Sequence, residues 1–454
     1  MMEKRAGVKE YTKILAGYVS DATYKSLPAP VVNTAKMCLL DWFGAVLAGK
    51  ENKEACIAKK FVNETGGREQ SSLIGYPEKS SCINAAFLSG VTAHVLEFDD
   101  VHEASILHPG APIISAAVAA AEKSGATVES LLLSVVLGYE VAIRIGECVG
   151  PSHYRYWHTT GTCGTFGAAT AAGKLFGLSK EQMVHCLGNA GTQAGGLWEC
   201  NREGAMSKVL HVGKAAANGV IAATLAKNDF TGASRILEGD RGFCRATAEE
   251  YDLSKLLDGL GRIYRILSVS YKPYPCCRHT HSAVDAGILI HGRKNIMWKD
   301  ITTVTVRTYS QAIETAGNMD PTTSREAKFS LPYCVSIALK KGEVGTGDFH
   351  EESINDRDVR GLMAKIRVLP DETMEEYYPG EWRASVEVSS EKGSNAACEI
   401  KYPYGHPKNA MDEEAIFKKY DTLLDGRGKS AMSRLFSLLM NKKKGKDTVM
   451  FSED

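Results

Sequence analysis

The chain has 454 residues, with 54 Lys and Arg against 54 Asp and Glu, and 44% of its residues are hydrophobic. This composition is typical of a globular protein of about two to three domains, and it excludes a disordered chain, a collagen and a disulfide miniprotein. The formal net charge of zero argues against a nucleic-acid partner, because such binding needs a basic excess to displace counterions from phosphates. The one dense basic run, Lys442 to Lys446, is expected to be a solvated helix end or tail.

The first 21 residues mix both charge signs and contain no apolar stretch that resembles a signal peptide, so we expect a cytoplasmic protein. The most apolar segment, 131–149, is interrupted by Glu140, Arg144 and Glu147, which predicts a buried core helix and no membrane partner. The 12 cysteines include no C-x-x-C pair, which fits reduced thiols and argues against a zinc ribbon.

The first 265 or so residues have the apolar periodicity of helices and are rich in small residues, which allow helices to pack closely. Ser179 and Gln182 have the spacing of a capping box, which marks a helix start. The predicted helices span 31–48, 85–97, 113–123, 128–149, 165–176 and 209–227. This part of the chain is therefore predicted to be a compact helical domain.

After residue 265 the pattern changes, because apolar and polar residues alternate in 301–309, 364–370 and 383–390, as expected for strands. Helical stretches, 282–291 and 327–340, lie between them, and a helical pattern resumes at residue 411. The predicted fold is mainly α with an α+β insertion. A helical domain over 1–268 is followed by an α+β domain over 269–408, and C-terminal helices over 409–454 return to the first domain.

Standard cofactor and metal motifs are not present in the sequence. Gly167 to Lys174 fails the P-loop spacing, and the glycines at 161, 164 and 167 are better explained by helix packing than by dinucleotide binding. The run from Cys276 to His281 holds metal-binding residue types without a second pair at finger spacing, and a turn near the domain junction explains it better. We therefore expect no cofactor and no metal.

Several polar residues lie in otherwise apolar helical context. They are Asp99, Asp100, His102, His108, His158, Lys208, His211 and Lys272. His108 and His158 each precede a predicted helix start, where free N–H groups and the helix dipole favour a carboxylate, and Lys208 shares a helix face with His211. Each residue alone is more simply explained by a structural role. Together they point to acid–base chemistry on a small anion, because enolate-like charge beside a carboxylate needs cations and hydrogen-bond donors nearby.

Six segments, in order along the chain, resemble landmarks of the MmgE/PrpD family. They are HVLEFDDVHEASILHPGAPIISAA (94–117), HTTGTCGTFGAATAAGKLFGL (158–178), SKVLHVGKAAANG (207–219), KPYPCCRHTHSAVDA (272–286), EAKFSLPYCVSIAL (326–339) and YPYGHPKNAMDEEAIFKKY (402–420). The resemblance implies a large all-helical domain with a smaller α+β lid domain, a cofactor-independent active site between the two, and a homodimer. The family includes methylcitrate dehydratases, cis-aconitate decarboxylases and an iminodisuccinate epimerase.

By motif position, the resemblance assigns catalytic roles to Asp99 or Asp100, His108, His158 and Lys208. Lys272, Cys277, Arg278 and His211 are the predicted substrate-binding residues. Cys277 stands where the decarboxylases carry a lid histidine, and ETAGNMDP (314–321) has no counterpart of their lid tyrosine, so decarboxylation is disfavoured.

We therefore predict a lyase that dehydrates a small citrate-like di- or tricarboxylate. The alternatives are an epimerase or isomerase, a decarboxylase of a related acid, and, from another class, a non-catalytic carboxylate-binding protein.

Overall fold

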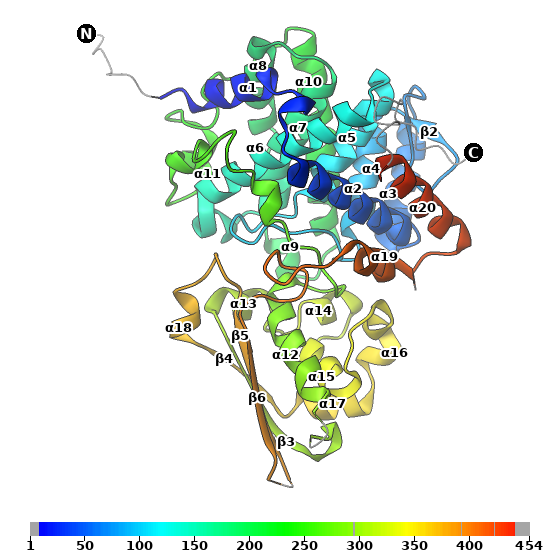
Figure 1. Cartoon of the computed structure of the whole chain (residues 1–454), viewed down its shortest axis with the longest axis vertical. Helices are drawn as coiled ribbons and strands as arrows, with labels where there is room; N and C mark the ends of the chain where they lie inside the picture. The colour runs from blue at the N-terminus through cyan, green and yellow to red at the C-terminus, as the bar shows by residue number, and fades with distance from the viewer. Residues whose placement is uncertain (1–8, 294–295, 392, 422, 441–454) are drawn as a thin grey trace. The chain divides into compact units, whose positions relative to one another are not determined.

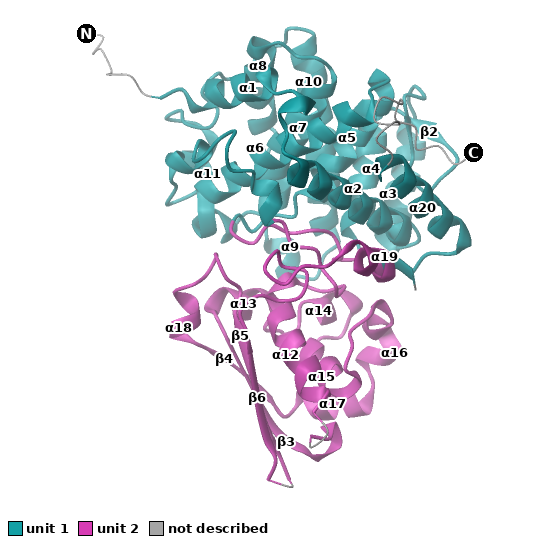
Figure 2. Ribbon diagram, viewed as in Figure 1, with its two compact units in different colours: residues 1–95, 105–268, 420–454 teal, residues 96–104, 269–419 magenta. Residues whose placement is uncertain are grey.

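The structure is a computed structural model, and it describes residues 9–293, 296–391, 393–421 and 423–440. The basic run from Lys442 to Lys446 lies outside the described residues. The chain divides into two compact units (Figure 2). The first unit comprises residues 1–95, 105–268 and 420–454, and the second comprises 96–104 and 269–419.

The first unit is a helical assembly (Figure 1). Its helices are α1 (Tyr11–Asp21), α2 (Ala29–Gly49), α3 (Lys53–Thr65), α4 (Cys82–His94), α5 (Gly110–Ser124), α6 (Val128–Tyr154), α7 (Thr159–Leu175), α8 (Lys180–Gly191), α9 (Glu199–Arg202), α10 (Ser207–Lys227), α11 (Phe243–Thr247) and α20 (Gly426–Met440). Two short strands, β1 (Ser71–Ser72) and β2 (Lys79–Ser80), pair antiparallel. All six helices predicted in this part of the sequence are present, and the capping box of Ser179 and Gln182 at α8 is confirmed.

Helix α7 is the centre of this unit, because α5, α6, α8 and α10 all pack against it. Small residues make the close approach possible. A Cβ atom at Gly138 of α6 would lie 2.9 Å from the Gly167 oxygen of α7, and one at Gly219 of α10 would lie 2.5 Å from Ala168 Cβ. The structure therefore bears out the prediction that small residues bring these helices together.

Among the described residues, two helices of the first unit, α2 and α10, are long and apolar enough to cross a membrane by length and composition alone. In the folded chain, 67% of the most apolar stretch of α2 and 61% of that of α10 are buried. Core helices of a folded domain have this character, because one side of the helix packs against its neighbours along its whole length.

Helix α6 ends in a kink. Gly150 has φ +57° and ψ −161°, a conformation that a side chain would strain, and Pro151 follows it. The last turn of α6 therefore changes direction before the chain reaches His158 at the start of α7.

The second unit combines a mixed sheet with helices (Figure 1). Its strands are β3 (Ile301–Thr308), β4 (Ile366–Pro370), β5 (Ala384–Ser390) and β6 (Asn395–Ile400), in the order β4-β3-β5-β6. β3 pairs parallel with β4 and antiparallel with β5, and β5 pairs antiparallel with β6. The three predicted strands are confirmed, whereas β6 was not predicted.

The helices of the second unit are α12 (His281–His291), α13 (Ser310–Ala316), α14 (Ser324–Lys328), α15 (Leu331–Lys341), α16 (Glu351–Ile354), α17 (Arg357–Met363), α18 (Glu372–Glu375) and α19 (Glu413–Asp421), of which α19 crosses into the first unit at Tyr420. Of these, α12 packs on β5 and β6, and α13 and α15 pack on β4. Val304 and Val306 of β3 lie opposite Val388 and Val386 of β5, and all four are buried. Helix α12 packs on β5, β6 and α15, so the alternating strand residues face a helical layer.

The division into units differs from the predicted domains at two places. Residues up to Lys419 belong to the second unit, whereas the sequence analysis placed the return at residue 409. The short segment 96–104 also belongs to the second unit. The backbones of Val101 and Ser270 form an antiparallel bridge in which each N–H donates to the carbonyl oxygen of the other residue. In both the prediction and the structure, residue 268 is the last one before the α+β part.

Candidate functional site

His158 occupies the N-cap position of α7 and is held there by backbone hydrogen bonds. Its carbonyl accepts from Gly161 N at 2.8 Å, and its own N–H donates to the Gly196 oxygen at 2.8 Å. The side chain is only 1% exposed. The imidazole is thus fixed at the positive end of a helix of 17 residues, which favours nearby negative charge.

Three more histidines of the first unit surround His158. The Nδ1 atoms of His158 and His211 lie 3.3 Å apart. The ring centroid of His94 is 5.7 Å from that of His158 and 5.1 Å from that of His108. Four imidazoles therefore form one cluster, which we call the histidine cluster: His94, His108, His158 and His211.

Trp198 and Lys208 complete this group in the first unit. The ring centroid of Trp198 lies 4.6 Å from that of His158. The backbone N–H of Trp198 donates a hydrogen bond to the main-chain carbonyl oxygen of Tyr156. Lys208 lies in the first turn of α10 and is 3% exposed, so its ammonium group is largely withdrawn from water. Its charge acts on His158.

The N-terminal turns of α5, α7 and α10 meet at the histidine cluster, and glycines allow this approach. A Cβ atom at Gly161 would lie 3.0 Å from His211 Cβ of α10, and one at Gly164 would lie 2.7 Å from Pro112 Cγ of α5. In addition, His108 N donates to Thr160 Oγ1 at 3.1 Å, which joins the approach to α5 to the first turn of α7. Three helix starts therefore lie around one set of imidazoles, and the positive ends of their helix dipoles favour an anion there.

The pKa of His158 is lowered well below its ordinary value, first by burial and then by the charges of Lys208, His94, His211 and His108. The imidazole is therefore neutral near pH 7 and has a lone pair available to accept a proton. A carboxylate placed beside it would oppose this effect and raise the pKa.

The remaining predicted site residues lie in the second unit, and the two cations there are paired with carboxylates. Lys272 Nζ lies 3.4 Å from Glu97 Oε2 and donates to the Glu97 oxygen of the main chain at 3.1 Å. Arg278 donates to Glu103 Oε1 through Nε at 3.0 Å and Nη2 at 2.9 Å. Both cations are buried, and the charge of each is balanced by a glutamate carboxylate of its own unit.

Asp99, Asp100 and His102 are also buried in the segment 96–104 of the second unit, as is Cys277 at the start of the turn that leads into α12. The prediction of a turn between Cys276 and His281 is confirmed, since Cys276 N donates to the Tyr274 oxygen and a short 3-10 helix spans Arg278–Thr280.

The structure thus places the predicted site residues in two groups, one in each unit. His108, His158, Lys208 and His211 come together in the first unit, and Asp99, Asp100, Lys272, Cys277 and Arg278 lie in the second. Sequence reasoning missed four neighbours of these residues: His94, Trp198, Glu97 and Glu103. His94 and Glu97 stand in the quoted segment that begins HVLEFDD, so their position beside the acidic loop was the available signal.

The chain thus combines a helical unit that holds a buried cluster of histidines beside Lys208 with an α+β unit built on a mixed sheet. Two family profiles match the chain, the MmgE/PrpD N-terminal domain over residues 13–255 and the MmgE/PrpD C-terminal domain over residues 274–442. The chain belongs to the MmgE/PrpD family.

Curated relatives match the chain over most of its length. A cis-aconitate decarboxylase of Aspergillus terreus is 26% identical over 444 residues, which cover 91% of this chain and 89% of the relative. A cis-aconitate decarboxylase of Homo sapiens is 26% identical, with 91% of this chain and 87% of the relative covered. A mitochondrial 2-methylcitrate dehydratase of Yarrowia lipolytica is 22% identical, with 93% and 85% covered. The relatives are thus enzymes named for tricarboxylate substrates.

Proposed function

We propose that this protein is a lyase that dehydrates a small di- or tricarboxylate of the citrate type, without an organic cofactor. The observation that supports this most strongly is the convergence of three helix N-termini and Lys208 on the histidine cluster. Family membership and the names of the relatives support the substrate class.

In the proposed reaction, Lys208 and the N–H groups at the start of α7 hold a substrate carboxylate. Charge that develops on this carboxylate when a neighbouring carbon loses its proton is then stabilised by a fixed cation and fixed dipoles. Because Lys208 is 3% exposed, its field is weakly screened by water, and its attraction for the developing charge is correspondingly strong.

His158 is the proposed base and His108 the proposed acid. His158 is neutral because burial and the charge of Lys208 lower its pKa, so it can accept the carbon-bound proton. The carboxylates of a bound substrate would raise this pKa, so that His158 becomes a stronger base when the substrate is present. His108, which is half-buried beside His94, would deliver a proton to the departing hydroxyl, which leaves as water.

Decarboxylation is the second candidate, and the identity of the relatives favours it, because the cis-aconitate decarboxylases match at up to 26% and the Yarrowia dehydratase at 22%. It would use the same carboxylate-binding group, with CO₂ loss followed by protonation of the carbon. We rank it second because Cys277 stands where the resemblance expects a histidine. An epimerase would share the proton abstraction and return the proton to the opposite face.

Proton NMR in D₂O with a panel of citrate, methylcitrate, cis-aconitate, malate and tartrate distinguishes these reactions. New olefinic signals with retention of all carboxylates indicate dehydration, loss of a carboxylate indicates decarboxylation, and deuterium uptake without net change indicates epimerisation. His158→Gln should lower kcat by about 10²- to 10⁴-fold. His350→Gln, which changes an exposed histidine of the second unit, is the matched control and should keep full activity.

Normal turnover by a folded His158→Gln protein would refute the assigned role of His158. Saturable binding of a carboxylate in calorimetry, without turnover or exchange of any acid in the panel, would instead support a non-catalytic binding protein. These two outcomes separate a wrong residue from a wrong class of function.

A further inference from the structure

The segment 196–198, which we call the strap, pairs antiparallel with the segment 156–158 just before α7. The two backbone hydrogen bonds between these segments are 2.8 and 3.1 Å long. Side chains of alternate residues in such a pairing point to one face, so His158 and Trp198 share a face. Their rings are accordingly in contact, with centroids 4.6 Å apart. The strap therefore fixes Trp198 beside the proposed base.

Gly196 of the strap lies opposite His158 and leaves room for His211. It has φ +145°, and a Cβ atom there would lie 3.0 Å from His211 Cγ and 3.1 Å from His211 Nδ1. Because no side chain fills this space, His211 Nδ1 approaches His158 Nδ1 to 3.3 Å. His158 is thus in contact with His211 through one nitrogen of its ring and with Trp198 through the strap.

Two buried polar atoms of this group, Nε2 of His158 and Nε1 of Trp198, form no hydrogen bond with any residue that the structure describes. When Nδ1 of His158 carries the proton and donates to His211, the lone pair of His158 is on Nε2, which is then an acceptor. The indole N–H of Trp198 can only donate. Buried donors and acceptors normally have partners, because an unmade hydrogen bond is costly there. An unmade donor beside an unmade acceptor therefore indicates a place where a bound molecule supplies the partners.

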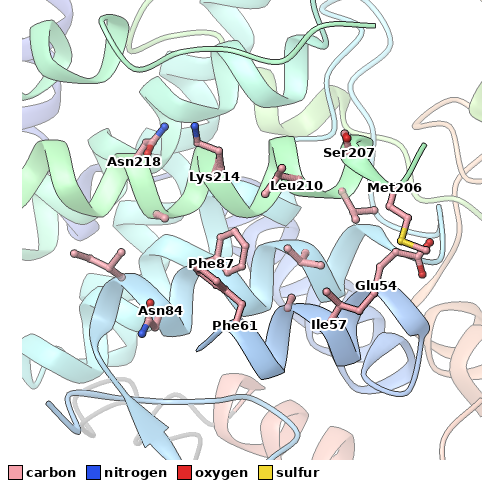
Figure 3. Close-up of a pocket in the computed structure, with 15 residues that line it drawn as sticks. Glu54, Ile57, Phe61, Asn84, Phe87, Met206, Ser207, Leu210, Lys214 and Asn218 are labelled. Carbon is pink, nitrogen blue, oxygen red and sulfur yellow. The ribbon is translucent and has the colours of Figure 1, made fainter. Parts of the chain in front are cut away.

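The exposed groove on another part of the first unit has a different character (Figure 3). It has a volume of about 590 Å³, and its largely apolar lining includes Ile57, Phe61 and Leu210. Lys214 is the one cation among the residues that line it, and none of these residues carries a buried polar atom without a partner. A small polycarboxylate is therefore better matched to the group around His158 than to this groove.

We propose that the indole N–H of Trp198 binds the substrate, as a hydrogen-bond donor to the carboxylate next to the carbon that His158 deprotonates. This inference rests on the proposed function and adds a substrate-binding residue to it. A carboxylate suits the donor better than a neutral group does, because buried Lys208 and the start of α7 belong to the same group. A hydrogen bond from Trp198 to one carboxylate oxygen places the adjacent carbon beside Nε2 of His158.

The role of Trp198 follows from where charge develops in the proposed elimination. The C–H bond breaks, its proton passes to Nε2 of His158, and its electron pair moves toward the carboxylate, whose oxygens gain negative charge. The electron pair then expels the hydroxyl group, which leaves as water with a proton from His108. Trp198 donates throughout and neither gains nor loses a proton. Its hydrogen bond strengthens as the charge grows, because a charged acceptor makes a hydrogen bond about twice as strong as a neutral one does.

Calorimetry with tricarballylate and succinate tests the donor without turnover, because neither acid has a hydroxyl group to lose. Trp198→Phe removes the N–H but keeps an aromatic ring, and it should raise Kd by about 10- to 100-fold through the loss of one charge-assisted hydrogen bond. Trp157→Phe is the matched control, since Trp157 is in the segment that pairs with the strap and its ring stacks on His153. The control should keep Kd within about threefold of that of the unchanged chain. Circular dichroism shows whether each variant is folded.

Two further measurements use turnover and the indole signal itself. With an acid that is turned over, Trp198→Phe should lower kcat by about 10²- to 10³-fold, as the loss of one donor to a developing charge does. The chain has five tryptophans, so protein labelled with ¹⁵N-tryptophan gives five indole N–H signals in nuclear magnetic resonance. Saturating tricarballylate should move one of them to lower field, and that signal should be missing from Trp198→Phe.

The role of Trp198 would be overturned if no indole signal of the unchanged chain moved at saturation, or if folded Trp198→Phe kept Kd within about threefold. An equal loss of affinity in Trp157→Phe would also overturn it, because the strap and not the donor would then set the affinity. Binding that depends on Trp198, without turnover of any acid, would refute the lyase and leave the donor in place. Turnover with full kcat in Trp198→Phe would do the reverse. An unchanged chain that binds neither acid at about 10 mM would overturn both.

Discussion

Replacing Arg144 by Met should destabilise the first unit strongly and in a pH-dependent way. Arg144 and Glu140 lie one turn apart on α6, and their side chains are both 0% exposed. Nε and Nη2 of Arg144 donate to Glu140 Oε2 at 3.3 and 3.2 Å. The same guanidinium donates to the main-chain carbonyl oxygens of Asp258, at 2.5 Å, and of Ile263, at 2.9 Å. It therefore holds residues 258–263 against the core.

The expected loss of folding free energy comes from the buried polar groups that lose Arg144 as a partner. Methionine preserves much of the apolar volume, but it leaves two carbonyl groups without a hydrogen-bond donor and one carboxylate without its cation. Removal of one partner of a buried ion pair costs about 3–5 kcal/mol, and we expect Arg144→Met to fall in this range at pH 8. Arg155→Met is the matched control, since Arg155 is 60% exposed in its pair with Glu249 and should cost less than about 1 kcal/mol.

The cost should be smaller at low pH because Glu140 can take up a proton. Burial raises the pKa of Glu140 from 4.5 to about 6, against the opposing charge of Arg144. A carboxyl whose pKa is higher in the folded state favours folding when protonated, so its contribution to stability falls as pH rises from 4.5 through the folded-state pKa. Without Arg144 that pKa rises further, and the loss of stability continues to higher pH than in the unchanged chain.

Urea denaturation followed by far-UV circular dichroism at pH 5 and pH 8 measures both effects. The difference between the unchanged chain and Arg144→Met should be clearly larger at pH 8. The double variant Glu140→Gln, Arg144→Met should be more stable at pH 8 than Arg144→Met alone, because no buried carboxylate remains. A loss below about 1 kcal/mol, or an equal loss at the two pH values, would refute the reasoning.

Three further predictions concern other parts of the chain. Gly167→Ala should cost about 1–3 kcal/mol in thermal unfolding, because the added Cβ would lie 2.6 Å from an α5 side chain and 2.8 Å from an α6 carbonyl oxygen, whereas Gly361→Ala, with open space around it, should cost nothing. Lys272→Met should destabilise the second unit by about 3–5 kcal/mol, and the added change Glu97→Gln should recover part of this loss; an unchanged melting temperature would contradict the buried pair. His94→Gln should lower the proposed turnover by at least about tenfold while the protein stays folded, and full kcat would show that His94 only fills space.

The sequence predicted those elements whose signal is local. Apolar residues recur with helical period through α6 as far as its kink at Gly150, and valines alternate with threonines from Thr303 to Val306 in β3, so both elements appear close to the expected places. The start of α7 was predicted six residues too late, because Gly161 and Gly164 have low helix propensity. Close contact with α5 and α10 requires these glycines, so packing outweighs propensity at this helix end.

The edge strand β6 was missed for a related reason. Its sequence, NAACEI, contains one β-branched residue and leaves most of its positions partly or fully exposed, so it has little intrinsic strand signal. It forms because β5 offers a row of backbone groups to pair with, from Ala384 opposite Ile400 to Ser389 opposite Asn395. Such pairing depends on the neighbouring strand and not on the residues of β6 themselves.

Those residues of the candidate site were predicted whose position in a helix can be recognised from the neighbouring sequence alone. His108 and His158 precede helix starts, and a helix start can be read locally from caps and glycines. The pairing of Lys272 with Glu97 joins residues that are far apart in sequence, and nothing in either segment specifies the partner. For the same reason the segment 96–104, which is flanked by helices of the first unit, could not be assigned to the second unit from its sequence.

The net charge of zero conceals a local difference between the two groups of predicted site residues. In the second unit, Lys272 and Arg278 each contact a buried glutamate, so the charges there are balanced by side chains of the protein itself. In the first unit, the positive ends of α5, α7 and α10 meet at the histidine cluster beside buried Lys208, and burial keeps His158 neutral. Helix dipoles add to the field of Lys208 without adding a formal charge that composition would reveal. This arrangement supports the proposed carboxylate-binding role of the first-unit cluster. The positions of His108 and His158 before helix starts indicated that role in the sequence, whereas the burial of Lys208 and the meeting of the three helix ends became apparent only in the fold.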